Sequence, residues 1–152
     1  MKSPADRIEK TVLLKAPRAR VWQALTDAEE FGVWFGVNLK GKAFKPGKRL
    51  QGKVTNPGYE HFTWKAQVED LAPERLFSWR WHPGRPDPKI DYAKEPETLV
   101  EFKLKEVEGG TLLTLVESGF DKLAEKRRSE AYRDNEGGWD QQMKNIRTHL
   151  VP

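Results

Sequence analysis

Glu117 is the residue of this sequence with the clearest prospect of carrying chemistry. It continues the alternation of Leu113 and Leu115, so its carboxylate is expected to face the interior with them. A buried carboxylate is costly unless it is hydrogen-bonded or paired, and burial would raise its pKa while a nearby arginine would lower it. Glu117 could bind a ligand hydroxyl or amine, or act as a general acid or base. The alternatives are a structural hydrogen bond to a Trp N–H or a Tyr hydroxyl, which we favour, and a bulge that turns Glu117 outward.

The other residue types that support catalysis or metal binding do not cluster. His61, His82 and His149 are far apart in the chain, form no H-x-x-x-H pattern and are expected at the surface, so no metal site is predicted. The sequence has no Cys, which excludes disulfides and thiol chemistry. It contains no nucleophile elbow, phosphate-binding loop or dinucleotide fingerprint. We therefore predict no cofactor and assign no catalytic residue.

Aromatic side chains gather on the faces that should point inward. The chain has six Trp among its 152 residues. A pocket lined by aromatic and aliphatic groups is the usual small-molecule site, but the same rings could simply fill a core, since each Trp buries about 200 Å². The expected inward set is Phe62, Trp64, Trp79, Trp81, Phe102, Leu115, Trp139 and Met143.

From this set we predict a ligand-binding site. Trp34 and Phe35 join it because they end a short helix at the expected entrance. The predicted ligand-binding residues are Trp34, Phe35, Trp64, Trp79, Trp81, Phe102, Glu117, Trp139 and Met143.

Hydrophobic periodicity predicts the elements that position these side chains. Alternation with period two indicates six strands, over residues 8–14, 49–54, 61–71, 76–82, 99–107 and 111–118. Two short helices should follow the first strand: Pro17 suits a first helical turn, Asp27 can cap the second helix and Gly36 can end it. Short turns between the late strands predict an antiparallel sheet, and a long C-terminal helix is the element left to cover one face.

That C-terminal helix contains two adjacent glycines, Gly137 and Gly138, beside Trp139. An interior Gly costs a helix about 1 kcal/mol relative to Ala. The pair could leave room for the indole or for a guest molecule, or it could kink the helix. Alternatively it marks a break between two helices, with Asn135 capping the second.

Length and composition indicate one domain over residues 1–152. We expect a cytoplasmic protein, because the sequence shows no secretory signal and no apolar run long enough to span a membrane. The net charge is +4, and Lys and Arg concentrate in residues 39–53. Such a patch could meet phosphate, but no nucleic-acid-binding motif accompanies it. We interpret it as a solvated hairpin with lysine-protected edges and predict no nucleic-acid partner.

The ordered motifs of the chain resemble the family of activator-of-heat-shock-protein-90-ATPase homologues, within the START-like or SRPBCC superfamily. Each motif is loose, and the specificity comes from their order and spacing. They are APRARVWQALTD at 16–27, WFG at 34–36, LAPERLFSWRW at 71–81, TLVEFKLKEVEGGTLLTLVESGF at 98–120 and NEGGWDQQMKNIRTHL at 135–150.

The resemblance implies the α+β helix-grip fold, in which a curved, six-stranded antiparallel sheet grips a long C-terminal helix with a cavity between them. Members of the superfamily bind lipids, hormones or polyketides, and some catalyse cyclisation or dehydration. The family name comes from a eukaryotic co-chaperone with a separate N-terminal domain that proteins of this length lack.

Three functional hypotheses follow. The first is a domain that binds a small apolar or aromatic molecule between the sheet and the last helix. The second is an enzyme of the cyclase, hydrolase or dehydratase type on the same scaffold, with Glu117 as acid or base. The third is a co-chaperone-like interaction domain that contacts the chaperone through residues 39–53.

Overall fold

The computed structural model describes residues 7–84 and 89–151 of the chain. Within these ranges it contains a curved sheet of six strands in the order β1-β6-β5-β4-β3-β2, with every neighbouring pair antiparallel. The elements are β1 (Arg7–Leu14), α1 (Arg18–Thr26), α2 (Ala28–Phe35), β2 (Arg49–Lys53), β3 (Thr63–Ala72), β4 (Leu76–Trp81), β5 (Thr98–Val107), β6 (Gly110–Ser118), the 3-10 turn η2 (Phe120–Lys122) and α3 (Glu125–Leu150).

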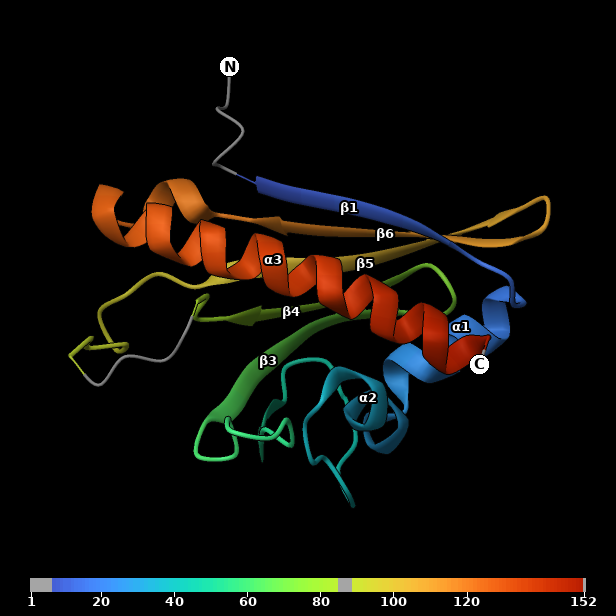
Figure 1. Cartoon of the computed structure of the whole chain (residues 1–152), viewed down its shortest axis with the longest axis horizontal. Helices are drawn as coiled ribbons and strands as arrows, with labels where there is room; N and C mark the ends of the chain where they lie inside the picture. The colour runs from blue at the N-terminus through green and yellow to red at the C-terminus, as the bar shows by residue number, and fades with distance from the viewer. Residues whose placement is uncertain (1–6, 85–88, 152) are drawn as a thin grey trace.

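This arrangement confirms the predicted α+β helix-grip fold. Figure 1 shows α3 lying along one face of the sheet, with α1 and α2 near its C-terminal end. The helix begins at Glu125, and its first turns, residues 125–131, carry both acidic and basic side chains. No helix of the described ranges is both long enough and apolar enough to cross a membrane.

The boundaries of α2 follow from local hydrogen-bonding chemistry, as predicted. The Asp27 side chain accepts a hydrogen bond from the backbone N–H of Glu30 at 3.1 Å, which satisfies one of the free donors of the first turn. Gly36 adopts a left-handed conformation with φ 94° and ends the helix. The end of α2 is thereby fixed, and Phe35 points into the core.

The core lies between the sheet and the helices. Inward-facing residues of β3, β4 and β5 pack against aromatic residues of α2 and against the buried face of α3. Phe31 stacks on Phe35 at 4.6 Å and meets Trp79 edge-on at 5.7 Å. The buried residues of α3 are Ala131, Trp139, Met143 and Ile146, and the last three recur at helical spacing on one face.

Two predictions need correction. Phe62 was expected inside with Trp64, but β3 begins at Thr63, and Phe62 is half-buried beside His61 at a ring distance of 4.1 Å. Strand alternation does not apply to Phe62, because this residue precedes the first residue of β3. Residues 39–53 do not form their own hairpin: a loop anchored by buried Leu39 and Phe44 leads into the edge strand β2.

Candidate functional site

The Glu117 carboxylate is the polar centre of the interior. It is fully buried, as the strand alternation predicts, and each of its oxygens accepts hydrogen bonds. Oε1 accepts from Trp139 Nε1 and Asn135 Nδ2, both at 2.8 Å. Oε2 accepts from Trp81 Nε1 at 2.8 Å, from Thr98 Oγ1 at 2.5 Å and from Asn135 Nδ2 at 3.1 Å. The favoured structural hydrogen bond to a Trp N–H is therefore present twice.

These partners come from three elements, β4, β5 and α3, which meet at Glu117 on a fourth, β6. In the register of the sheet, Trp81 on β4 pairs with Thr98 on β5. Glu117 on β6 pairs with Val100, two residues further along β5. Asn135 and Trp139 lie one turn apart on α3, so both reach the sheet from the same helical face. One carboxylate therefore ties three strands to the helix.

The four partners that Glu117 has among residues 7–84 and 89–151 are all neutral. Burial raises the pKa of Glu117 above its ordinary value of 4.5, although the hydrogen bonds from Thr98, Trp139, Trp81 and Asn135 act in the opposite direction. Both indoles can only donate. The Asn135 side chain is oriented by its second contact, in which Oδ1 accepts from the Gly84 backbone N–H at 3.0 Å.

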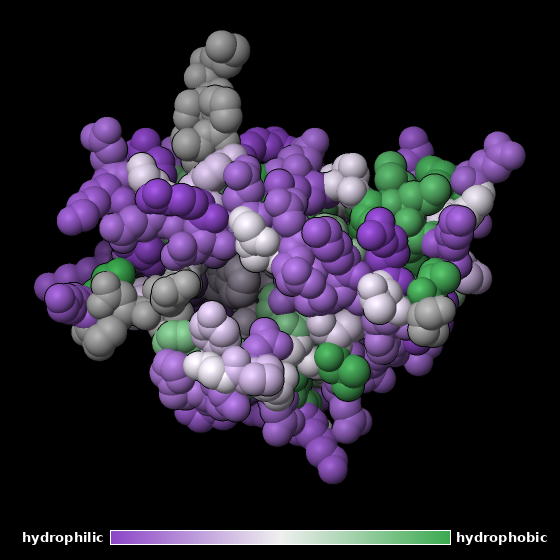
Figure 2. All heavy atoms as spheres, in the orientation of Figure 1, coloured by the Kyte–Doolittle hydropathy of each residue, from purple (hydrophilic) through white to green (hydrophobic). Residues whose placement is uncertain are grey.

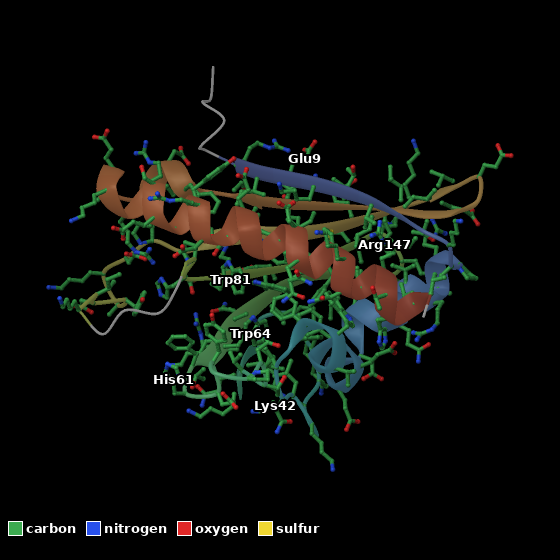
Figure 3. All side chains as sticks on the ribbon, in the orientation of Figure 1. Glu9, Lys42, His61, Trp64, Trp81 and Arg147 are labelled. Carbon is green, nitrogen blue, oxygen red and sulfur yellow. The ribbon has the colours of Figure 1, made fainter. Side chains whose placement is uncertain are left out.

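A pocket of about 190 Å³ opens beside this carboxylate, under α3. The surface hollow beneath α3 in Figure 2 coincides with the position of Trp81 in Figure 3. The pocket is lined by Phe35, Trp81, Asn135, Gly138, Trp139 and Gln142. Three of the four Glu117 donors thus form its wall, and Glu117 itself lies behind them.

The polar side chains of the wall already have protein partners. Gln142 Nε2 donates to the Phe35 carbonyl oxygen at 2.8 Å, and Gln142 Oε1 accepts from Asn145 at 3.0 Å. Asn135 donates a hydrogen bond to Glu117 and accepts one from the Gly84 backbone N–H. The pocket therefore offers a guest mainly ring faces and helix backbone.

The predicted ligand-binding residues divide into three groups. Phe35, Trp81 and Trp139 line the pocket. Others lie beneath it: Trp79 and Phe102 pack against Trp139 at ring distances of 6.3 and 5.7 Å. The remaining ones do not line it, since Trp64 is buried on β3, Met143 is buried further along α3, and Trp34 donates its N–H to the Ala24 carbonyl at 2.8 Å.

The two glycines do not interrupt the helix, because α3 runs continuously through them, and this excludes the alternative of a break between two helices. A Cβ at either position would meet no atom within 4 Å, so neither glycine is needed to make room for the Trp139 indole. Gly138 nevertheless lines the pocket, and Gly137 does not. Room for a guest molecule at Gly138 stays a prediction, as does a kink in α3 at the glycine pair.

Sequence reasoning missed Asn135, Gln142 and Thr98 as parts of this site. A usable signal existed: Asn135, Gly138, Trp139 and Gln142 are spaced i, i+3, i+4 and i+7, which is one helical face. In residues 7–84 and 89–151, no three or more acidic or His side chains come together in a way that could hold a metal ion.

Solved structures similar to this chain share its fold at low sequence identity. Protein MLL2253 from Mesorhizobium loti has a TM-score of 0.71 and 20% identity, over 95% of this chain and 96% of that one. Protein Ms6760 from Mycobacterium smegmatis has a TM-score of 0.76 and 18% identity, over 97% and 91%. DynU16, a protein of the dynemicin biosynthetic locus, has a TM-score of 0.70 and 22% identity, over 97% of this chain and 48% of its own.

One protein family, described as "Activator of Hsp90 ATPase homolog 1-like protein", matches residues 15–151. No protein with a curated description matches the chain. The family match covers every element of the fold after β1.

Proposed function

The chain belongs to the family of activator of Hsp90 ATPase homolog 1-like proteins, and on that premise we propose that its pocket under α3 binds a small, neutral aromatic molecule. The observation that carries the proposal is the wall of the pocket. Three aromatic rings, from Phe35, Trp81 and Trp139, surround an open volume, and every polar side chain of its described lining already has a protein partner.

The volume limits the size of the guest. Pockets for drug-sized ligands measure about 300–1,000 Å³, whereas an apolar cavity of about 150 Å³ accepts benzene. A pocket of about 190 Å³ therefore suits a molecule of one or two rings. Burial of about 150–200 Å² of apolar surface, at about 25 cal/mol per Å², supports an affinity in the high micromolar to millimolar range.

The chemistry of the wall limits the charge of the guest. An ionised ligand would lose its hydration and find no free donor or acceptor side chain in return, since Asn135 and Gln142 are engaged. Ring faces of Trp and Phe instead favour stacking and edge contacts with another ring. A neutral aromatic guest satisfies both conditions.

Glu117 fits the role of a positioning residue better than that of a catalytic acid or base. A general base must come within about 3 Å of the proton that it takes. The Glu117 oxygens are fully buried behind Trp81, Asn135 and Trp139 and already accept five hydrogen bonds. A guest would have to displace a donor to reach them.

The two glycines supply a matched pair of variants that tests this proposal. Gly138→Leu places a side chain at the pocket, whereas Gly137→Leu places the same side chain one residue away, outside the lining. Both changes raise helix propensity by about 0.8–1 kcal/mol, so both variants should fold. With indole as the probe, we expect Gly138→Leu to lose affinity at least tenfold and Gly137→Leu to stay within twofold.

The measurement is a titration of the isotope-labelled chain followed at the indole N–H signals of Trp81 and Trp139. Native mass spectrometry of the purified protein adds a search for a retained molecule. Equal affinity of the two leucine variants for indole would contradict the proposal. So would unchanged Trp81 and Trp139 signals with indole and with other neutral probes of one and two rings.

A further inference from the structure

A second, larger cavity lies over the outward-facing side chains of β2 and β3. Its volume is about 550 Å³, which falls within the usual range for ligand pockets. Strand alternation places it there: Leu50 and Trp64 are buried in the core, whereas their neighbours on β2 and β3 point outward. The lining consists of Arg49, Gln51, His61, Phe62, Thr63, Lys65, His82, Gly84, Tyr92 and Ala93.

The charge of this cavity differs from that of the pocket under α3. Arg49 and Lys65 contribute basic side chains, two imidazoles accompany them, and none of the lining residues within 7–84 and 89–151 is acidic. Lys65 is exposed on β3. Glu97 lies beside the cavity, 3.6 Å from Arg49, and neutralises part of the charge without entering the lining.

Aromatic rings and polar groups complete the walls. Phe62 and Tyr92 contribute rings, next to His61 at 4.1 Å and His82 at 5.1 Å respectively. Within residues 7–84 and 89–151, buried Nδ1 of His82 has no hydrogen-bond partner. Unsatisfied buried polar atoms are uncommon in folded proteins, and a water, an ion or a functional role can account for one.

We propose that this outer-face cavity binds a small aromatic molecule that carries a carboxylate. Lys65 and Arg49 supply the attraction for the anion, and Phe62 and Tyr92 supply the ring contacts. The site is separate from the pocket under α3, because the two share no lining residue. Its existence is independent of the function proposed for that pocket.

The test uses two probes of the same shape that differ in charge, 2-naphthoate and 2-naphthamide. The full chain is titrated with each probe, and two groups of NMR signals are followed. Backbone amides of Gln51, Thr63 and Ala93 report on the outer cavity, and indole N–H signals of Trp81 and Trp139 report on the pocket under α3. We expect 2-naphthoate to shift the first group and to bind there at least tenfold more tightly than 2-naphthamide. Its affinity should fall as salt is added.

Lys65→Met should weaken 2-naphthoate binding at least fivefold. Lys53→Met is the matched control, because Lys53 is an exposed residue of β2 with the same strand parity as Arg49 and Gln51 but lies outside the lining. It should change the affinity less than twofold. Arg49→Met, at a second point of the lining, should weaken binding in the same direction as Lys65→Met.

Several results would overturn the proposal. One is an equal affinity of the outer cavity for the two probes, and another is an equal loss of 2-naphthoate affinity in Lys65→Met and Lys53→Met. The others are a 2-naphthoate titration that shifts only the Trp81 and Trp139 signals, and one that shows no binding at all. A short single-stranded DNA that bound more tightly than 2-naphthoate and depended on both lysines would replace the small-molecule site with a nucleic-acid surface.

Discussion

Glu117 and Glu30 are two glutamates of the same molecule in opposite electrostatic settings. Glu117 is fully buried and accepts hydrogen bonds from four neutral side chains. Glu30, on α2, is partly exposed and meets Arg20 at 2.6 Å and His149 at 2.7 Å. Burial raises the pKa of Glu117. Partial burial also acts on Glu30, but the contacts with Arg20 and His149 outweigh it and lower the pKa of Glu30.

The difference separates two uses of a carboxylate. At Glu30 the contacts with Arg20 and His149 join α1, α2 and the C-terminal end of α3, and water still reaches the cluster. At Glu117 the described partners include no cation, and the carboxylate instead fixes the orientation of Trp81 and Trp139 through their N–H groups. The second arrangement is costly in free energy, which is typical of a site that must keep its shape.

The largest expected effect comes from removing the Glu117 acceptor. Glu117→Met keeps most of the volume but leaves two indole N–H groups, an amide and a hydroxyl without their partner. Each buried unsatisfied donor costs about 1–3 kcal/mol, and partial rehydration through the pocket reduces the sum, so we expect a loss of about 3–5 kcal/mol. Urea unfolding measures it. A loss below about 1 kcal/mol would show that the network contributes little.

The next effect is a pair of opposite pH dependences. The raised pKa of Glu117 means that the folded state holds its proton more tightly than the unfolded state, so this contribution to stability falls as pH rises above about 4.5. The lowered pKa of Glu30 gives a contribution that is present above about 4.5 and is lost as pH falls below it.

Urea unfolding at several pH values measures both dependences. The difference between wild type and Glu117→Gln should shrink as pH rises, and the difference between wild type and Glu30→Gln should shrink as pH falls. Two differences that change in the same direction would remove the distinction between the carboxylates.

A smaller effect should follow from deleting one donor. Trp81→Phe keeps a ring in the pocket wall but removes an N–H from Glu117, with an expected loss of about 1–2 kcal/mol that grows with pH as Glu117 ionises. Trp64→Phe is the control, because Trp64 Nε1 has no hydrogen-bond partner within the described part of the chain. Its loss reflects volume and should not depend on pH. Parallel pH profiles for the two variants, obtained from urea unfolding, would count against the proposed network.

The smallest effect is expected at the exposed cluster. His149→Gln removes one of the two basic partners of Glu30, and partly exposed ion pairs contribute about 0.5–1 kcal/mol or less. Thermal unfolding should show a decrease of a few degrees at most. Arg7→Gln, which breaks a highly exposed pair with Glu9, should cost no more than a few tenths of a kcal/mol. A loss at His149 equal to that of Glu117→Met would contradict the comparison.

Much of the fold was predictable because its signals are local. Asp27 and Gly36 mark the ends of α2 through hydrogen bonds and a backbone conformation that involve near neighbours in the chain. Alternation with period two correctly predicted that the Glu117 side chain points from β6 into the interior. The same rule failed at Phe62, because periodicity does not show where a strand ends.

The candidate site was predictable only in part. Phe35, Trp81 and Trp139 were expected to bind a ligand and do line the pocket, whereas Trp64 and Met143 were expected there and lie elsewhere in the core. Nothing local distinguishes a Trp whose N–H meets Glu117 from one whose N–H has no partner in the described structure. The distinction depends on which strand pairs with which, and in what register.

The amino-acid sequence was thus sufficient to predict the helices and strands, the inward face of most strands and the burial of a carboxylate near the end of β6. The partners of that carboxylate, the opening of a pocket beside Gly138 and the basic cavity over β2 and β3 came from the packing of segments that are distant in the chain. Trp81 and Glu117 are 36 residues apart, and their contact exists because β4, β5 and β6 align in one register while α3 is docked across them. Contacts of this kind depend on how distant segments pack in three dimensions, which short-range patterns in the sequence do not predict.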